Sequence, residues 1–320
     1  MPLPVRPFGK TGLSFPLLSM GCGFPFGFGG FDRAVAAVRR AYERGIRYFD
    51  NSPLYRSGTA QAITGEALAG LSPQPFVATK VGHFKVGRFF RSVEALHVQL
   101  HENLRILRRD SVDLLQIHEA DWANWWTDRP DAAPCVLFDV QKTYDFANAP
   151  VMQFLREAKA HGLCRHVGIT GNNARHLTRL VRELPGIDSV LVAYNTMPLN
   201  SSARVDLIPA ATTKGLAVVV AGLFTFIHRI PEGWRTEGTY FGSHADEQLA
   251  QLQKVQRQAG MLMEQLVLRW ATADERISTL LVGACLPEEV DQNLAAVIMP
   301  PLPKDLHAAV EAIAAQFDHW

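Results

Sequence analysis

Four side chains in the first part of the chain could together protonate a carbonyl group: Asp50, Tyr55, Lys80 and His118. A carbonyl that accepts a hydride becomes an alkoxide, which a tyrosine hydroxyl can protonate if a nearby cation lowers the tyrosine pKa from about 10. Lys80 can supply that cation, Asp50 can hold the ammonium group, and His118 can donate a hydrogen bond to the carbonyl oxygen. A structural interpretation competes with this one, in which Asp50 and Lys80 form an ion pair beside two packed rings. Four such residues at the ends of predicted strands favour catalysis.

The segment from Ile46 to Tyr55 decides where two of these residues lie. Gly45 closes an amphipathic run and so predicts the end of a helix, while the mostly apolar and β-branched residues after it predict a strand. Pro53 stops the strand, which leaves Asp50 at its carboxyl end and Tyr55 on the loop beyond. Enzymes of the α/β classes carry their chemistry at that end of the strands.

The rest of the chain alternates between predicted strands and helices. This alternation predicts parallel strands, and eight of them predict an α/β fold of the (β/α)8 TIM-barrel type rather than an open doubly wound sheet. The doubly wound alternative lacks its fingerprint, because phenylalanine stands at the third glycine position after Gly21-Cys22-Gly23. The predicted strands span 17–21, 47–50, 76–80, 112–118, 166–170, 189–194, 217–221 and 278–283, and helices include 34–44, 93–107, 151–161 and 174–184.

Three further segments complete the predicted architecture. Residues 5–8 and 13–15 flank a turn-rich tetrapeptide and predict a short amino-terminal β-hairpin that plugs one end of the barrel. Long loops follow the fourth strand, at 119–150, and the seventh strand, at 223–244. Loops of that length on the carboxyl face of a barrel are usually functional.

Composition favours a single domain, residues 1–320, that acts on small molecules. Hydrophobic residues make up 48% of the chain, enough for a sizeable core, and 32 basic against 31 acidic side chains predict no affinity for nucleic acid or an anionic membrane. The absence of a signal peptide or a long apolar run predicts a cytoplasmic protein without a membrane partner. The sequence leaves the oligomeric state open. Four scattered cysteines, Cys22, Cys135, Cys164 and Cys285, predict reduced thiols.

Segments along nearly the whole chain resemble the aldo-keto reductases. The run Phe-Asp-Asn-Ser-Pro-Leu-Tyr that ends at Tyr55 is similar to the family's Phe-Asp-Thr motif, and matching segments follow in order at 79–82, 112–118, 167–171, 268–270 and 282–293. The resemblance implies a (β/α)8 barrel, a nicotinamide cofactor and the catalytic roles given above for Asp50, Tyr55, Lys80 and His118. Gly-Ile-Thr-Gly at 168–171 resembles the branch that contains galactose and related sugar dehydrogenases.

The resemblance also implies a set of cofactor contacts at the strand ends. Many relatives hold the nicotinamide amide with Ser-Asn and a glutamine, where this chain has Thr170-Gly171 and Leu191, so that Asn172 or Asn195 would have to compensate. Some members of the family carry a ring-stacking aromatic residue on the seventh strand, and this chain has Ala221 at that position. The implied cofactor residues are Gly21, Cys22, Asp50, Thr170, Gly171, Gly222, Leu223, Gly283, Glu289 and Asn293.

The segment after the last strand favours NAD(H) slightly over NADP(H). Strongly NADP-dependent members carry a lysine and an arginine where this chain has Gly283 and Glu289, so the partners of a 2′-phosphate are missing. A carboxylate can instead accept hydrogen bonds from free ribose hydroxyls. The other interpretation makes Glu289 an ordinary first-turn residue, with Arg269 or Arg276 meeting the phosphate.

Aromatic residues in two loops are candidates for binding substrate. Phe24, with Phe26 and Phe28, follows the first barrel strand, and Trp122 and Trp125, with Trp126, follow His118. Such rings could stack on a sugar or an aromatic aldehyde, or could only anchor their loops. No metal is expected, because His97 and His101 lack the glutamate and the third ligand of a zinc motif.

The sequence therefore predicts a nicotinamide-dependent oxidoreductase that interconverts a small aldehyde, ketone or sugar and an alcohol. The alternative is a cofactor-binding regulatory or interaction module with weak or no turnover, similar to the β subunits of potassium channels. The four candidate catalytic residues favour the enzyme.

Overall fold

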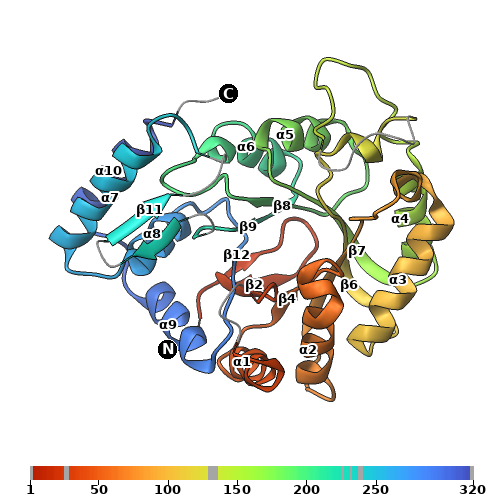
Figure 1. Cartoon of the computed structure of the whole chain (residues 1–320), viewed down its shortest axis with the longest axis horizontal. Helices are drawn as coiled ribbons and strands as arrows, with labels where there is room; N and C mark the ends of the chain where they lie inside the picture. The colour runs from red at the N-terminus through yellow and green to blue at the C-terminus, as the bar shows by residue number, and fades with distance from the viewer. Residues whose placement is uncertain are drawn as a thin grey trace.

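Eight parallel strands close into a barrel in the order β12-β3-β4-β5-β6-β7-β8-β9, which confirms the predicted (β/α)8 architecture (Figure 1). The computed structural model describes residues 3–24, 29–128, 136–224, 227–230, 233–236 and 241–317. Each predicted barrel strand is present, with ends shifted by at most two residues. The strands are β3 (Leu18–Gly21), β4 (Tyr48–Asp50), β5 (Phe76–Val81), β6 (Val112–Ile117), β7 (Cys164–Gly171), β8 (Ser189–Ala193), β9 (Ala217–Ala221) and β12 (Thr279–Val282).

Helices pack around the outside of the strands. Helix α3 shows why these segments are helical: the Ser92 side chain accepts the Ala95 N–H at the start, and Leu96, Leu100 and Leu104 form a buried stripe with a spacing of four residues. Gly45, with φ +99°, follows α1 as predicted. The helices are α1 (Phe31–Glu43), α2 (Thr59–Leu68), α3 (Val93–Leu107), α4 (Pro150–Ala160), α5 (Ala174–Glu183), α6 (Leu207–Thr213), α7 (Ala245–Ala259), α8 (Met263–Thr272), α9 (Pro287–Ile298) and α10 (Lys304–Ala314).

The predicted amino-terminal hairpin consists of β1 (Val5–Pro7) and β2 (Ser14–Pro16), which pair antiparallel. Phe8 and Phe15 are buried against the rings of Tyr48 and Phe76, which begin β4 and β5. The Arg6 guanidinium donates to the carbonyl oxygens of residues 272, 274 and 277, at 2.6–2.9 Å. The hairpin therefore closes the amino-terminal end of the barrel, opposite the strand ends that carry Asp50 and Lys80.

The two predicted long connections are present, and each contains short secondary structure of its own. The first, after β6, contains a 3-10 turn at Ala123–Trp125. The second contains an antiparallel pair, β10 (Ile227–Ile230) and β11 (Gly233–Thr236), which the sequence analysis did not predict. Helix α7 follows that pair and packs beside α10 (Figure 1). Cys135, Phe26 and Phe28 lie outside the described residues. Within the described ranges, no helix is both long and apolar enough to span a bilayer.

Candidate active site

Asp50 and Lys80 form a buried ion pair at the carboxyl ends of neighbouring strands. The Lys80 Nζ donates to Asp50 Oδ1 and, at 2.8 Å, to the Asn51 carbonyl. The second Asp50 oxygen accepts from the Tyr48 hydroxyl at 3.2 Å and from Gln116 Nε2 at 2.8 Å. Burial alone would lower the Lys80 pKa, but Asp50 and Tyr55 outweigh burial and raise it. Lys80 therefore stays an ammonium ion at neutral pH.

Tyr55 lies over this pair, with the Lys80 Nζ 4.8 Å from the centre of its ring. Lys80 lowers the Tyr55 pKa as the sequence predicted, but burial has the larger effect and raises the net pKa above its ordinary value of 10. The predicted net lowering is thus wrong for this structure, because desolvation of the phenolate outweighs attraction to the lysine. Tyr55 is protonated at neutral pH, the form that can donate to a carbonyl oxygen.

His118 follows β6 directly and packs edge-on against Tyr55, with ring centres 5.7 Å apart. Burial, and then the charges of Lys80 and His83, lower the His118 pKa well below 6.5. The imidazole is therefore neutral at pH 7. Its Nδ1 lies 3.0 Å from the Ser52 hydroxyl, in the loop that joins Asp50 to Tyr55. The structure thus brings all four predicted catalytic residues together.

His83 and Glu119 extend this group, and the sequence analysis missed both. The His83 ring lies 4.3 Å from the His118 ring and 4.7 Å from the Trp122 ring, centre to centre. Its Nε2 is 2.9 Å from Glu119 Oε2. Both residues have positive φ, 55° and 51°, which side-chain-bearing residues rarely adopt. Only their positions in the sequence could have indicated them, because Glu119 directly follows His118 and His83 is three residues after Lys80.

The segment where the nicotinamide amide was expected is tied to the loop after β6. Thr170 Oγ1 accepts the Glu119 N–H at 3.1 Å, and Asp121 Oδ2 accepts the N–H groups of Asn172 and residue 173. A Cβ on Gly171 would lie 2.9 Å from the Asp121 carboxyl carbon, so only glycine fits there. Burial raises the pKa of Asp121 to about 7.

The two asparagines that could compensate at this position already have partners. Asn195 donates to the carbonyl oxygens of Asn172 and Ala193 and accepts the Ala174 N–H. The Asn172 amide donates to Glu119 at 2.8 Å. Both side chains therefore stabilise the strand ends themselves.

Three residues expected near the adenosine phosphate, Gly283, Glu289 and Asn293, lie in the connection before α9 and within that helix. Glu289 Oε2 accepts the N–H groups of Cys285 and Leu286, at 2.7 and 3.2 Å, and so caps the helix. Asn293 Nδ2 lies 3.4 Å from the Gly283 carbonyl. The Glu289 carboxylate thus already accepts from two backbone N–H groups just before α9.

The two arginines considered as phosphate partners face elsewhere. Arg269 donates to the carbonyl oxygens of Pro300 and Pro301. Arg276 pairs with Asp274, whose carbonyl binds Arg6 of the plugging hairpin. Arg276 therefore lies at the end of the barrel away from the strand ends of the site.

The remaining predicted cofactor residues lie at the carboxyl ends of strands or on the loops that follow them. Gly21 pairs in register with Asp50, and the Cys22 N–H donates to the Asp50 carbonyl. Burial raises the pKa of the Cys22 thiol to about 12, so it stays protonated. Gly222 has φ +71°, and a Cβ there would lie 2.4 Å from the Tyr194 ring. Leu223, the next residue, is buried.

The predicted substrate-binding aromatics divide by their contacts. Trp125 is 0% exposed, and its Nε1 donates to the carbonyls of His118 and Glu119. Trp126 Nε1 donates to the Ala120 carbonyl. These two rings anchor the loop, whereas Trp122 contacts the His83 ring beside His118. Phe24 is also buried.

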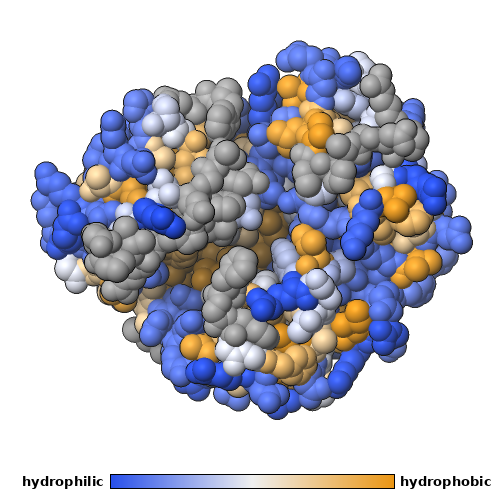
Figure 2. Space-filling view, in the orientation of Figure 1, coloured by the Kyte–Doolittle hydropathy of each residue, from blue (hydrophilic) through white to orange (hydrophobic). Residues whose placement is uncertain are grey.

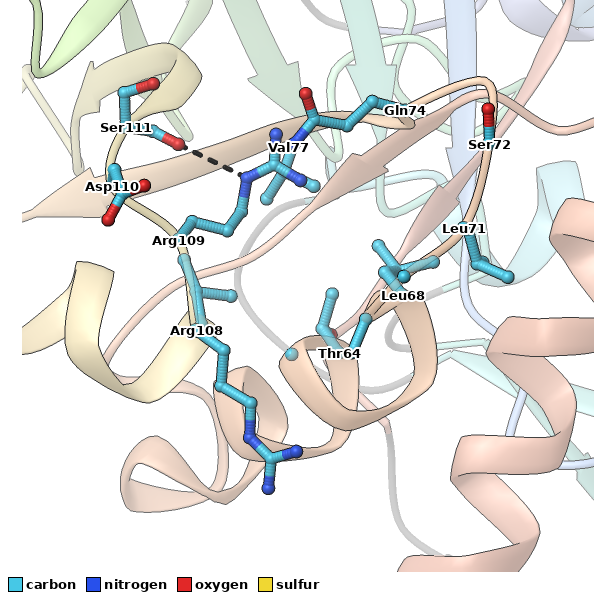
Figure 3. Close-up of a pocket in the computed structure, with 14 residues that line it drawn as sticks. Thr64, Leu68, Leu71, Ser72, Gln74, Val77, Arg108, Arg109, Asp110 and Ser111 are labelled. Carbon is cyan, nitrogen blue, oxygen red and sulfur yellow. Dashed lines mark hydrogen bonds between the residues drawn. The ribbon is translucent and has the colours of Figure 1, made fainter.

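Two other features bear on where chemistry can occur. A cavity of about 480 Å³ lies between the carboxyl ends of α2 and α3 and the starts of β5 and β6 (Figure 3). Figure 3 shows Arg109 turned toward Ser111 and Arg108 turned away; none of the four candidate catalytic residues lines this cavity. The face in Figure 2 is hollowed near its middle, with hydrophobic residues in its depth.

His97 and His101 are accounted for by contacts on the outer surface of the barrel. The His97 Nε2 lies 3.0 Å from Glu157 Oε2, and the centres of the two imidazole rings are 6.5 Å apart. In the part of the chain that the structure describes, no three His, Cys, Asp or Glu side chains are grouped to hold a metal ion.

Comparison with known proteins gives consistent matches over nearly the whole chain. The model of the Aldo/keto reductase family matches residues 27–315. L-galactose dehydrogenase of Arabidopsis thaliana is 29% identical over 307 residues, which are 92% of this chain and 88% of that protein. A protein of Schizosaccharomyces pombe named "Putative voltage-gated potassium channel subunit beta" is 25% identical over 325 residues, 92% of this chain and 88% of its own. The holo form of an aldo-keto reductase from Bacillus halodurans shares the fold, with a TM-score of 0.75, 22% identity and coverage of 97% and 96%.

Proposed function

The chain belongs to the aldo/keto reductase family, and from this premise we propose that it is a nicotinamide-dependent oxidoreductase that interconverts a small carbonyl compound and an alcohol. The observation that carries the proposal is the grouping of a protonated tyrosine, a neutral histidine and a buried lysine at adjacent strand ends. These are the donors that a carbonyl oxygen needs as it becomes an alkoxide. Residues 1–320 form one catalytic domain in this proposal.

The donor set fits a nicotinamide cofactor, which supplies or accepts the hydride when bound. Tyr55 donates its proton to the substrate oxygen in reduction and regains it in oxidation. The Lys80 ammonium stabilises the phenolate that remains, and Asp50 keeps Lys80 charged and in place. His118 orients the same oxygen by a hydrogen bond. The residues that would hold the cofactor are Gly21, Cys22, Thr170, Gly171, Gly222, Leu223, Gly283, Glu289 and Asn293.

We further propose a sugar or another small aldehyde or ketone as the substrate, and NAD(H) as the preferred cofactor. The similarity to L-galactose dehydrogenase supports a sugar. Glu289 supports NAD(H), because its carboxylate caps the amides where a 2′-phosphate would otherwise be attracted. Trp122 is the aromatic residue best placed to influence substrate choice, through its contact with His83.

A regulatory cofactor-binding module is the second candidate. Two observations favour it: the name of the Schizosaccharomyces pombe relative, and the engagement of Asn172 and Asn195 within the protein instead of with an amide ligand. The complete set of Asp50, Tyr55, Lys80 and His118 favours catalysis.

The test combines cofactor binding with turnover. Fluorescence titration with NADH and NADPH measures binding, and a panel of aldehydes, ketones and sugars measures turnover. We expect Tyr55→Phe to lower kcat by at least the roughly 10²-fold that losing a proton donor causes, with an unchanged cofactor Kd. Tyr42→Phe is the matched control, because that hydroxyl binds the Pro73 carbonyl on the outer side of the barrel. Near-native turnover by Tyr55→Phe would exclude Tyr55 as the acid, and cofactor binding without turnover of any substrate would favour the regulatory module.

A further inference from the structure

Ser52 is a fully buried residue in the loop between Asp50 and Tyr55. Its hydroxyl oxygen lies 3.0 Å from His118 Nδ1 and accepts the Leu54 N–H at 3.1 Å. Its own N–H donates to the Asn51 side chain at 3.0 Å, which fixes the serine within the turn. Ser52 thus links the turn between Asp50 and Tyr55 to one ring nitrogen of His118.

Counting protons decides the direction of the Ser52 to His118 hydrogen bond. A serine hydroxyl has one hydrogen to donate and two lone pairs to accept with. Leu54 uses one lone pair. If His118 Nδ1 carried the imidazole proton and donated to Ser52, the buried serine hydrogen would need another acceptor, and the described residues provide none. A buried donor without an acceptor is disfavoured, so the serine hydroxyl donates to Nδ1.

The position of the remaining imidazole proton follows. A neutral imidazole has one N–H, and with Nδ1 accepting from Ser52 that proton is on Nε2. Among the described residues, no side chain or carbonyl accepts from Nε2. In the opposite tautomer, Nε2 would carry a lone pair, and that lone pair would repel the lone pairs of the substrate oxygen.

We propose that Ser52 is a positioning residue that selects the Nε2–H tautomer of His118, so that His118 can donate to the substrate oxygen. The proposal rests on the proposed function for the identity of the acceptor. If Ser52 were only structural, its hydroxyl would accept the Leu54 N–H and stabilise the turn without affecting the His118 tautomer. Only the positioning role requires His118 to be in the Nε2–H tautomer.

The experiment is NMR of the full chain labelled with 15N-histidine, which distinguishes the two neutral tautomers by their nitrogen shifts and long-range couplings. A His118→Gln spectrum assigns the His118 signals. We expect the Nε2–H pattern in the wild type at pH 7, with and without NADH. In Ser52→Ala we expect the Nδ1–H form to appear and kcat to fall about ten-fold, less than the 10²-fold or more lost with a whole oxyanion donor.

Two further variants separate positioning from folding. Ser201→Ala removes another buried serine hydroxyl, which donates to the Ala314 carbonyl and not to His118, and should lower Tm without changing the His118 tautomer or kcat. Ser52→Thr keeps the hydroxyl and should keep both the Nε2–H pattern and kcat.

Two results overturn the proposal, and a third overturns only its link to the substrate. An Nδ1–H wild type contradicts the proton count directly, whatever the variants do. A Ser52→Ala protein that loses activity with the tautomer unchanged assigns the serine to the turn alone. If the tautomer is as expected but no carbonyl or alcohol is turned over, the proposed function and the substrate role of Nε2 fail together, while the Ser52 to Nδ1 bond is confirmed by the spectrum.

Discussion

Lys80 is the buried cation of the site and donates to Asp50 and to the Asn51 carbonyl. We expect Lys80→Met to lower kcat strongly and to lower stability by about 3–5 kcal/mol, because Asp50 would be left buried without its cation. Urea denaturation and kcat measure the two effects. Lys159→Met is the control, since its pair with Asp188 is exposed and 3.4 Å long, and such pairs contribute at most about 1 kcal/mol. A Lys80→Met protein as stable and active as the wild type would make the buried pair dispensable.

The pH dependence of the same variant has a definite sign. The folded-state pKa of Lys80 is raised above 10.5, so its contribution is complete below the unfolded pKa and is lost as pH rises through the folded value. The difference in unfolding free energy between wild type and Lys80→Met should therefore stay constant from about pH 7 to 9 and shrink only above about pH 10.5. A difference that shrinks below pH 9 would contradict the raised pKa.

In the proposed function, the preference for NAD(H) over NADP(H) depends on Glu289. We expect wild-type NADPH to bind no more tightly than NADH, and Glu289→Arg to tighten NADPH binding by about ten-fold, because a carboxylate is replaced by a phosphate partner. Dissociation constants for both cofactors measure this. Glu288→Arg, the same charge reversal one residue earlier at an exposed position, should change the ratio of the two constants much less. Tighter wild-type NADPH binding that Glu289→Arg leaves unchanged would show that the phosphate lies elsewhere.

The loop after β6 combines anchoring and recognition in neighbouring tryptophans. We expect Trp125→Ala to lower stability by about 3–5 kcal/mol and to reduce turnover of all substrates alike. The substitution leaves a cavity in the core and removes the indole N–H that donates to the His118 carbonyl. Trp122→Ala should instead change the ranking of substrates in the panel, because its ring contacts His83. Tm and kcat/KM across the panel separate the two outcomes. A shifted substrate ranking with an unchanged Tm for Trp125→Ala would reverse these assignments.

Elements with strong local sequence signals were predicted well, and elements with weak signals were missed. Helix α3 and strand β9 have the predicted bounds, because a four-residue leucine spacing and a β-branched run each specify one structure. Strands β10 and β11 were missed because each has four residues and little alternation, and they are stabilised by pairing with each other.

The same distinction holds within the site. Asp50, Tyr55, Lys80 and His118 were found because each ends or follows a recognisable strand. The contacts of Ser52 and Gln116 were not, because each bond joins residues 66 positions apart and depends on barrel register. The net direction of the Tyr55 pKa shift also required the structure, since burial cannot be read from residue types.

The plugging hairpin concerns the stability of the whole barrel and lies far from the chemistry. We expect Arg6→Ala to lower unfolding free energy by about 1–3 kcal/mol, because three carbonyls lose their donor, and to leave kcat unchanged. Arg165→Ala is the control, because it removes an exposed arginine at the second residue of β7, near the same end of the barrel. Loss of activity without loss of stability in Arg6→Ala would connect the hairpin to the site.

The seam of the barrel joins segments that are far apart in the chain. Leu18 of β3 pairs in register with Leu280 of β12, and the Ser19 hydroxyl lies 2.7 Å from that of Thr279. During synthesis β3 leaves the ribosome early, but β12, which pairs with it on the side opposite β4, is made only when most of the chain is complete. Until then the growing sheet has two unpaired edges, which are templates for pairing with other chains. Ribosome stalling ahead of β12 should therefore produce aggregating chains, whereas release after α9 allows the ring of strands to close.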